Sequence, residues 1–199
     1  MSKSFLQAVA NRRTYYGISN EKIVPEPMVV EIVESALKHT PSAFNSQNSR
    51  VLVLFGAEHD AFWSIAMAAL RAIVPAEKFA PTEEKINSFA AGYGTVLFFE
   101  DMSVVENLQT QFPGYAVNFP IWSGQASGML QFVVWAALEA EGLGASLQHY
   151  SPLVDEGMYS RWDVPRSWKL TAQMPFGKPT APAGEKTFLP LNERVKIYR

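Results

Sequence analysis

The stretch "HTPSAFNSQNSRVLVLFG", His39 to Gly56, joins a helix-like pattern to a strand-like pattern through a run of polar residues. Helices rarely continue into a proline, so the preceding helix is expected to end before Pro41. The segment 49–56 is dense in aliphatic residues and is bounded by polar residues and a glycine, which predicts a buried strand. The polar run between them is either an ordinary solvated loop or a set of hydrogen-bonding groups aimed at a flat polar ligand.

Outward from this stretch, helical and strand-like patterns alternate. The helical patterns cover 4–13, 26–39, 61–74, 81–94, 103–112, 121–142 and 153–164, and the strand-like patterns cover 49–56, 94–101, 144–150 and 168–179. Ser103 is a candidate N-cap for the helix that follows it. The prolines of the tail predict an extended arm over about 179–199. The pattern indicates an α+β fold in a single domain, residues 1–199.

Composition excludes several classes of protein. Of the 199 residues, 48% are hydrophobic and 18% are charged, so the chain can bury a core. The net charge of -2 gives no electrostatic reason to expect nucleic acid or an anionic membrane as a partner. There is no cysteine, which excludes disulfides and thiolate ligands and fits a reducing compartment, so a cytoplasmic location is expected. No apolar run approaches the roughly 20 residues of a membrane span.

The segment "NRRTYYGIS" places two adjacent arginines where the first helix should end. A guanidinium group presents a planar fork of donors that matches phosphate oxygens, so Arg12 and Arg13 are candidate phosphate ligands, with the hydroxyls of Thr14 and Tyr16 nearby. The alternative is that the two cations complement a helix C-terminus.

The segment "EGLGASLQHYSP" ends the long helix with glycines and starts a strand. Backbone amides in such a turn can donate to an electron-rich ring nitrogen or carbonyl. Glycine also ends helices for purely steric reasons, so Gly142 and Gly144 alone are weak evidence. Lys186, in the tail, is by itself expected to be a solvated lysine.

Taken in order, these segments resemble the nitroreductase family of FMN-dependent oxidoreductases. The resemblance consists of Arg-Arg-Thr after the first helix, Pro-Ser-Ala-Phe-Asn-Ser-Gln before the first strand, Gly-Leu-Gly-Ala before a late strand, and Phe-Gly-Lys-Pro with a basic residue before Pro-Leu near the end. It spans nearly the whole chain. The sequence looks closest to the short subgroup of the fatty-acid-repression-mutant type, which shares "HTPSAFNSQ" and "QHYSP".

The resemblance implies a sandwich in which a small, mostly antiparallel sheet is flanked by helices. It also implies an intertwined homodimer with FMN at the interface, and small residues at 123–128 would let a partner helix approach closely. The C-terminal arm would wrap the partner subunit. The residues implied to bind the cofactor are Arg12, Arg13, Thr14, Tyr16, Ser42, Ala43, Asn45, Ser46, Gln47, Gly144, Ala145, Gln148, His149 and Lys186. Many relatives carry a second cation after the tail lysine, where this chain has Thr187-Phe188.

The implied activity is reduction of nitroaromatic or quinone-like acceptors by NADH or NADPH, with both substrates using one cleft in turn. The flavin would carry the redox chemistry, so no catalytic side chain and no metal is assigned. Candidates to line the cleft are Phe44, Tyr93, Phe112, Tyr115, Phe119 and Trp122. The alternative for most of them is a place in the core at helical spacing, so none is assigned to the cleft. The alternative is a flavin-binding sensor or regulatory protein with little turnover.

Two other classes of enzyme have little support in the sequence. A hydrolase could combine His149, Ser151 and Asp155, but no G-x-S-x-G elbow is present. A metal enzyme is poorly supported, because the three histidines are scattered and show no ligand spacing.

Overall fold

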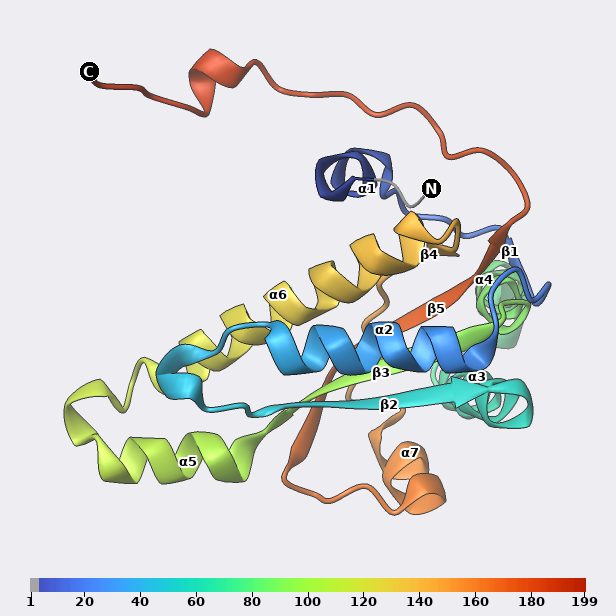
Figure 1. Cartoon of the computed structure of the whole chain (residues 1–199). Helices are drawn as coiled ribbons and strands as arrows, with labels where there is room; N and C mark the ends of the chain where they lie inside the picture. Colours follow the sequence, from blue (N-terminus) through green and yellow to red (C-terminus); the bar gives the residue numbers. More distant parts are fainter. Residues whose placement is uncertain (1–3) are drawn as a thin grey trace.

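The structure is a computed structural model that describes residues 4–199 (Figure 1). The helices are α1 (Phe5–Asn11), α2 (Glu26–His39), α3 (Gly56–Arg71), α4 (Ala80–Ala90), α5 (Met102–Gln111), α6 (Phe119–Ala140) and α7 (Asp155–Trp162). The strands are β1 (Ile18–Ser19), β2 (Ser49–Phe55), β3 (Gly94–Asp101), β4 (Gly144–Ala145) and β5 (Trp168–Pro179). Short 3-10 turns include η1 (Ala43–Asn45), η3 (Pro113–Tyr115) and η4 (Leu191–Glu193).

The strands form one antiparallel sheet in the order β1-β5-β3-β2, and β4 also pairs with β5. Strand β3 is buried at every position, which explains its continuous apolar sequence. Successive side chains of a strand point to opposite faces, so Val96 and Phe98 join one core while Leu97 and Phe99 join the other. The predicted α+β sandwich with a small antiparallel sheet is therefore confirmed.

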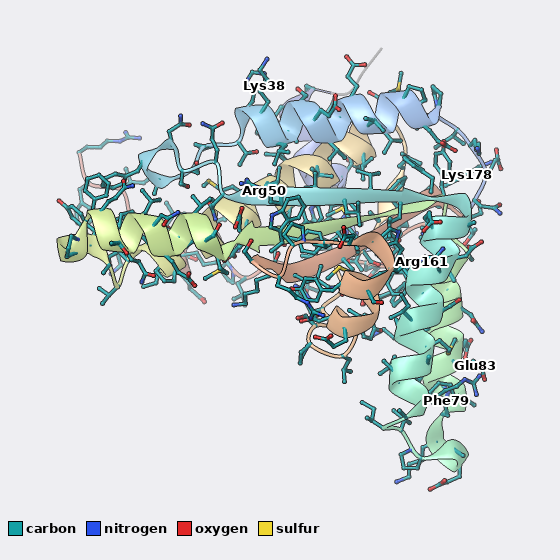
Figure 2. The ribbon with its side chains drawn as sticks, turned by 90° about the horizontal axis from the view of Figure 1, so that it is seen from below. Lys38, Arg50, Phe79, Glu83, Arg161 and Lys178 are labelled. Carbon is teal, nitrogen blue, oxygen red and sulfur yellow. The ribbon has the colours of Figure 1, made fainter. Side chains whose placement is uncertain are left out.

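Helices cover both faces of the sheet (Figure 1). On one face α2 and α6 contribute Val29, Val33, Val134 and Leu138 to the core. On the other face the core is completed by side chains of α3, α4 and α7, which include Phe62, Trp63, Ile86, Phe89 and Met158. The hairpin of α3 and α4 extends beyond the sheet, with Phe79 and Glu83 at its far end (Figure 2).

The strand predicted over 144–150 is interrupted. Gly144 and Ala145 pair with β5, and the same register resumes only at the isolated bridge between Gln148 and Gln173. Between them Ser146 donates its N–H to the carbonyl oxygen of Pro175 (3.2 Å). Proline has no N–H to return to the ladder, so the regular pairing stops there.

Several further elements differ from the prediction. Helix α3 begins at Gly56 rather than at 61, and α4 ends at Ala90 rather than at 94. Strand β1 was not predicted, because two residues carry no periodic signal. Helix α5 is capped by Asp101, whose carboxylate accepts from the N–H of Ser103 (3.2 Å), so Ser103 is not the cap. An ionised carboxylate at this position also complements the helix dipole.

The chain after Pro179 has no helix or strand apart from the short turn η4, and it runs past α1 along one side of the molecule (Figure 1). The extended form of the predicted arm is thus present. Among residues 4–199, no helix is both long enough and apolar enough to cross a bilayer.

Candidate functional site

The polar run of the opening stretch forms a tight loop, Pro41–Gln47, which we call the Ser42 loop. Phe44, Asn45 and Gln47 have positive φ angles of 56°, 50° and 47°, which is uncommon for residues other than glycine. Ser42 holds this shape: its carbonyl oxygen accepts from the N–H of Asn45 (3.0 Å), and its hydroxyl accepts from the N–H of Gln47 (3.0 Å). The loop is therefore fixed by its own hydrogen bonds, with Phe44, Asn45 and Gln47 exposed.

Asn48, immediately after the loop, attaches it to α6. This residue is buried, and its amide nitrogen donates to the hydroxyl of Ser123 (2.6 Å) while its amide oxygen accepts from the hydroxyl of Ser46 (2.9 Å). Sequence reasoning placed Asn48 in the polar run but did not identify Ser123 as its partner. Ser123, one of the small residues near the start of α6, thus also holds the loop in place.

Arg50, at the start of β2, also holds the Ser42 loop in place (Figure 2). Its guanidinium group donates to the carbonyl oxygens of Gln47 (2.6 Å) and Ser49 (3.0 Å) and to the carboxylate of Asp101 (3.0 Å). Burial alone would raise the pKa of Asp101, but hydrogen bonds from serine hydroxyls and the charge of Arg50 outweigh it and lower this pKa below its ordinary value. Sequence reasoning missed Arg50, because an arginine inside a strand gave no signal of a link to the loop.

The predicted cationic segment lies at the end of α1. The Arg12 guanidinium lies over the ring of Trp135 in α6, 4.3 Å from its centroid. Burial, and then the neighbouring charge of Arg13, lower the pKa of Arg12 from its ordinary value. Arg13 donates to the carbonyl oxygen of Gly184, so the tail passes directly beside the two arginines.

The glycine turn after α6 meets this cationic segment, a contact that sequence reasoning did not predict. Thr14 and Ala145 form a parallel bridge, and the N–H of Tyr15 donates to the carbonyl oxygen of Ala145 (3.0 Å). A Cβ atom on Gly144 would lie 2.9 Å from side-chain atoms of both Tyr15 and Pro179, closer than van der Waals contact allows. Glycine is therefore required at 144 for the two segments to meet.

Within one chain the Ser42 loop does not reach the cationic segment. The loop is attached to α6 at Ser123, whereas Arg12 lies on Trp135 of the same helix. At 1.5 Å per residue these two points are about 18 Å apart along the helix axis. The two candidate half-sites, the Ser42 loop and the cationic segment, thus lie at opposite ends of α6 (Figure 1).

The other predicted site residues have different environments. Gln148 is buried, and its amide donates to the hydroxyl of Ser146 (3.0 Å). His149, Tyr16 and Lys186 are exposed, with the Lys186 ammonium 5.1 Å from the centroid of the Phe188 ring. Their roles at a cofactor stay predictions.

Five of the six aromatic candidates converge on the Ser42 loop, and we call them the Phe44 cluster. Its members are Phe44, Phe112, Tyr115, Phe119 and Trp122, brought together from the loop, the residue after α5, η3 and α6. The sixth candidate, Tyr93, is buried in the sheet core against Phe55 and Phe176. An open surface hollow of about 460 Å³ lies beside the cluster.

The hydrolase alternative finds no support in the geometry. The hydroxyl of Ser151 donates to the carboxylate of Asp155 (3.0 Å), so its proton is directed at the acid rather than at a base. Among the described residues, His149 makes no hydrogen bond to Ser151. A nucleophile-base pair requires such a bond or a close approach to it.

The chain is similar to two proteins of Saccharomyces cerevisiae. It is 37% identical to the putative nitroreductase HBN1, over 94% of this chain and 93% of HBN1. It is also 37% identical to the nitroreductase FRM2, over 98% of this chain and 97% of FRM2. The structure of nitroreductase CinD from Lactococcus lactis in complex with chloramphenicol superposes with a TM-score of 0.90 at 45% identity, covering 98% of this chain and 100% of CinD.

At lower identity the fold alone is shared. A nitroreductase with bound FMN from Desulfitobacterium hafniense is 16% identical, with a TM-score of 0.70 over the full length of both chains. The sequence model of the Nitroreductase family matches residues 9–178. That match, together with relatives that cover almost the entire sequence, makes this chain a member of the Nitroreductase family and an oxidoreductase of the nitroreductase type.

Proposed function

We propose that the protein is an FMN-dependent oxidoreductase that uses NADH or NADPH to reduce nitroaromatic or quinone-like acceptors. The observation that carries the proposal is the pair of half-sites, one cationic and one rich in amides, whose donors match the two ends of FMN. Members of the family and of its fold have been crystallised with FMN, chloramphenicol and 4-nitrophenol.

The residues present fit FMN. Arg12 and Arg13 would hold the phosphate through charge-assisted hydrogen bonds, with Lys186 of the adjacent tail near them. The side-chain amides of Asn45 and Gln47 make no hydrogen bond to a described residue, so their donors and acceptors are available to a ring or a ribityl chain. Gly144 keeps the second segment free of a side chain at its meeting point with Tyr15.

We further propose that the two half-sites join across a homodimer, so that the Ser42 loop of one chain faces the cationic segment of the other. Many large apolar side chains on α1, α6 and the tail are exposed, as expected for an interaction surface. They include Leu6, Ile121, Met129, Leu191 and Ile197, each more than two-fifths exposed. All three elements lie on the same side of the molecule, and the arm would wrap the partner there (Figure 1).

The dimer gives a direct prediction. At micromolar concentration light scattering should report twice the chain mass of 22.1 kDa. A Cβ on Gly128 of α6 would meet no atom within 4 Å in its own chain, so Gly128→Glu should fold and yet shift the protein toward monomer by burying a charge at the interface. Gly114→Glu, also in open space but away from the middle of α6, is the matched control. A monomeric wild-type mass would contradict the proposal.

In this proposal the protein binds and orients FMN, and FMN carries the redox chemistry. FMN, when bound, supplies the electron-carrying ring, and the protein's side chains hold its phosphate and its polar edge. Because the Ser42 loop is already ordered, it would orient the ring with no further loss of loop entropy on binding. One cleft receives the nicotinamide donor and then the acceptor, which requires ping-pong kinetics.

Colour provides the test. The purified protein, or protein reconstituted with FMN, should be yellow, and its flavin absorption should bleach on anaerobic addition of NADH or NADPH and return with a nitroaromatic acceptor. Yellow protein that does not bleach would instead favour the flavin-binding sensor. A protein that cannot be loaded with FMN would overturn both.

A further inference from the structure

A row of aromatic side chains crosses the core from Tyr16 to the surface at α7. The Tyr16 ring centroid lies 6.0 Å from that of Phe89, and the Phe89 centroid lies 5.0 Å from that of Trp63. The row continues from Trp63 to Phe62 (5.1 Å) and from Phe62 to Trp162 (6.3 Å). Each step is within the roughly 4.5–7 Å at which aromatic rings are in contact. We call these five residues the Trp63 row.

Only the ends of the Trp63 row reach the surface. Tyr16, one of the predicted cofactor residues, is 53% exposed and lines an open hollow of about 380 Å³ beside α4. Trp162 is partly exposed at the end of α7, on the side of the sheet away from α6 (Figure 1). The three rings between them are at most 1% exposed. The row therefore connects the cationic half-site to the surface at α7 through the core.

The indole N–H of Trp63 points at a proton acceptor. It donates to the hydroxyl oxygen of Thr95 (2.9 Å), which lies 2.8 Å from Nδ1 of His59. Nε2 of His59 lies 3.1 Å from the carbonyl oxygen of Ala90, which can only accept, so Nδ1 is the unprotonated nitrogen. Both steps are within the distance that proton transfer requires. A neutral base is thus connected to a buried indole through one hydroxyl group.

Trp162, at the other end of the row, also has a base at its indole nitrogen. Its N–H donates to the carboxylate of Glu58 (2.8 Å). Hydrogen bonds from Arg161 and from Trp162 lower the pKa of Glu58 below its ordinary value, so this carboxylate is ionised. An indole that has lost an electron is a much stronger acid than a neutral indole, so a nearby base makes the loss of an electron easier. Both tryptophans of the row meet this condition.

We propose that the Trp63 row carries single oxidising equivalents from the cofactor cleft to the surface at α7, and so protects the cleft from oxidising radicals. The inference rests on the proposed function, because Tyr16 would lie at the flavin. Tryptophan and tyrosine are the aromatic side chains that lose one electron most easily. The phenylalanines between them fill the space through which the electron passes.

The inner half of the row reduces the oxidant. A peroxyl radical in the cleft takes a hydrogen atom from Tyr16 and becomes a hydroperoxide. Trp63 then gives an electron to Tyr16, which takes a proton from water. The indole proton of Trp63 passes to Thr95 as the Thr95 proton moves to Nδ1 of His59. The resulting imidazolium donates from both of its nitrogens, so it leaves no buried donor without a partner.

The outer half of the row returns Trp63 to its resting state. Trp162 gives an electron to Trp63, and the proton on His59 returns along the same two hydrogen bonds. The indole proton of Trp162 goes to Glu58. A dissolved thiol then gives a hydrogen atom to Trp162, and Glu58 releases its proton to water. The net reaction converts a peroxyl radical and a thiol into a hydroperoxide and a thiyl radical.

Flash photolysis of the FMN-loaded protein tests the row, with photoexcited FMN as the one-electron oxidant and transient absorption as the readout. The wild type should form a neutral tryptophanyl radical. Trp63→Phe should reduce the yield of this radical several-fold. Trp162→Phe should shorten its lifetime, because the radical can no longer move away from the flavin. Trp162 is only partly buried, so this second variant should fold even if Trp63→Phe does not.

The matched control is Trp168→Phe, which removes a partly buried tryptophan outside the row. It should leave the yield and the lifetime of the radical unchanged. If Trp63→Phe and Trp162→Phe both behave as this control does, the inference is wrong.

Thr95→Val tests the proton step. It leaves the indole of Trp63 with no path to His59, so the radical should appear as the protonated cation instead of the neutral form. A loss of stability alone would not produce this spectral change. A neutral radical in Thr95→Val would contradict the assignment of His59 as the proton acceptor.

Peroxyl radicals from a water-soluble azo initiator test the row without FMN. Trp63 is 1% exposed, so oxidation reaches it only through the ends of the row. Peptide mass spectrometry should find oxidised Trp63 in the wild type and several-fold less in the double variant Tyr16→Phe/Trp162→Phe, which removes the oxidisable ring at each end. Unoxidised Trp63 in the wild type, or equal oxidation in the two proteins, would overturn the inference. A protein that binds no FMN would contradict the proposed function and leave this result unaffected.

Discussion

Replacing Trp63 with alanine is expected to lower the free energy of unfolding by about 3–5 kcal/mol. The Trp63 side chain is 1% exposed and packs against Phe62, Phe89 and Tyr150, with ring centroids 5.0–6.0 Å away. Truncation would leave a large cavity in the core between the sheet and α3, because neighbouring side chains collapse only partly into the space. Urea unfolding followed by circular dichroism measures the change.

Trp63 also begins a chain of buried hydrogen bonds that enlarges the effect. Its indole N–H donates to the hydroxyl oxygen of Thr95 (2.9 Å), which lies 2.8 Å from Nδ1 of His59. Nε2 of His59 lies 3.1 Å from the carbonyl oxygen of Ala90, which can only accept, so Nε2 carries the proton and Nδ1 accepts from Thr95. Burial of the ring lowers the pKa of His59, which agrees with this neutral form.

The variant Trp63→Phe keeps one aromatic ring in the core. It removes the indole N–H donor to Thr95 and part of the indole volume, so the loss should be smaller than that of Trp63→Ala, about 1–3 kcal/mol. A loss for Trp63→Ala below about 1.5 kcal/mol would show that this core relaxes around the cavity and that the site is not closely packed.

Replacing Arg13 with alanine is expected to weaken FMN binding roughly ten- to a hundredfold. A charge-assisted hydrogen bond to a phosphate contributes on the order of 1.5–3 kcal/mol, and each 1.4 kcal/mol is a factor of ten in affinity. One donor of Arg13 is already used on the carbonyl oxygen of Gly184, and the remaining donors of its fork are available. Titration of FMN fluorescence with apoprotein measures the dissociation constant.

Two comparisons make the result specific. Arg13→Lys keeps the charge and loses the planar fork, so its affinity should fall between those of wild type and Arg13→Ala. Arg166→Ala removes an exposed arginine that pairs with Glu156 of α7, on the opposite side of the molecule, and should leave FMN affinity unchanged (Figure 1). If Arg13→Ala binds FMN as well as the wild type does, the phosphate does not lie at the end of α1.

Local patterns were sufficient for most elements of the fold. The apolar runs at 49–55 and 94–101 are strands, and the amphipathic pattern at 26–39 is a helix with the expected bounds. These signals are strong because a buried strand and a half-buried helix each impose their own period on many residues. Where the deciding partner was distant in sequence, prediction failed, as at Pro175, which interrupts the strand predicted over 144–150.

Some residues of the candidate site could likewise be identified from local sequence, and others could not. The residue types of the Ser42 loop and of the Arg12 segment could be identified from the sequence, because amides, arginines and glycines have restricted chemical and conformational uses. The anchors Ser123 and Arg50 could not be identified, because each acts on the loop through a contact that spacing does not reveal.

By itself the sequence determined which segments carry polar and cationic groups, which segments are buried strands, and the family to which the chain belongs. Only the tertiary structure decided that the two candidate half-sites lie at opposite ends of α6 and that five aromatic rings meet at Phe44. The physical reason is that a helix is stiff and rises by a fixed distance per residue. Two segments that bind to different positions on the same helix are therefore held at the distance between those positions.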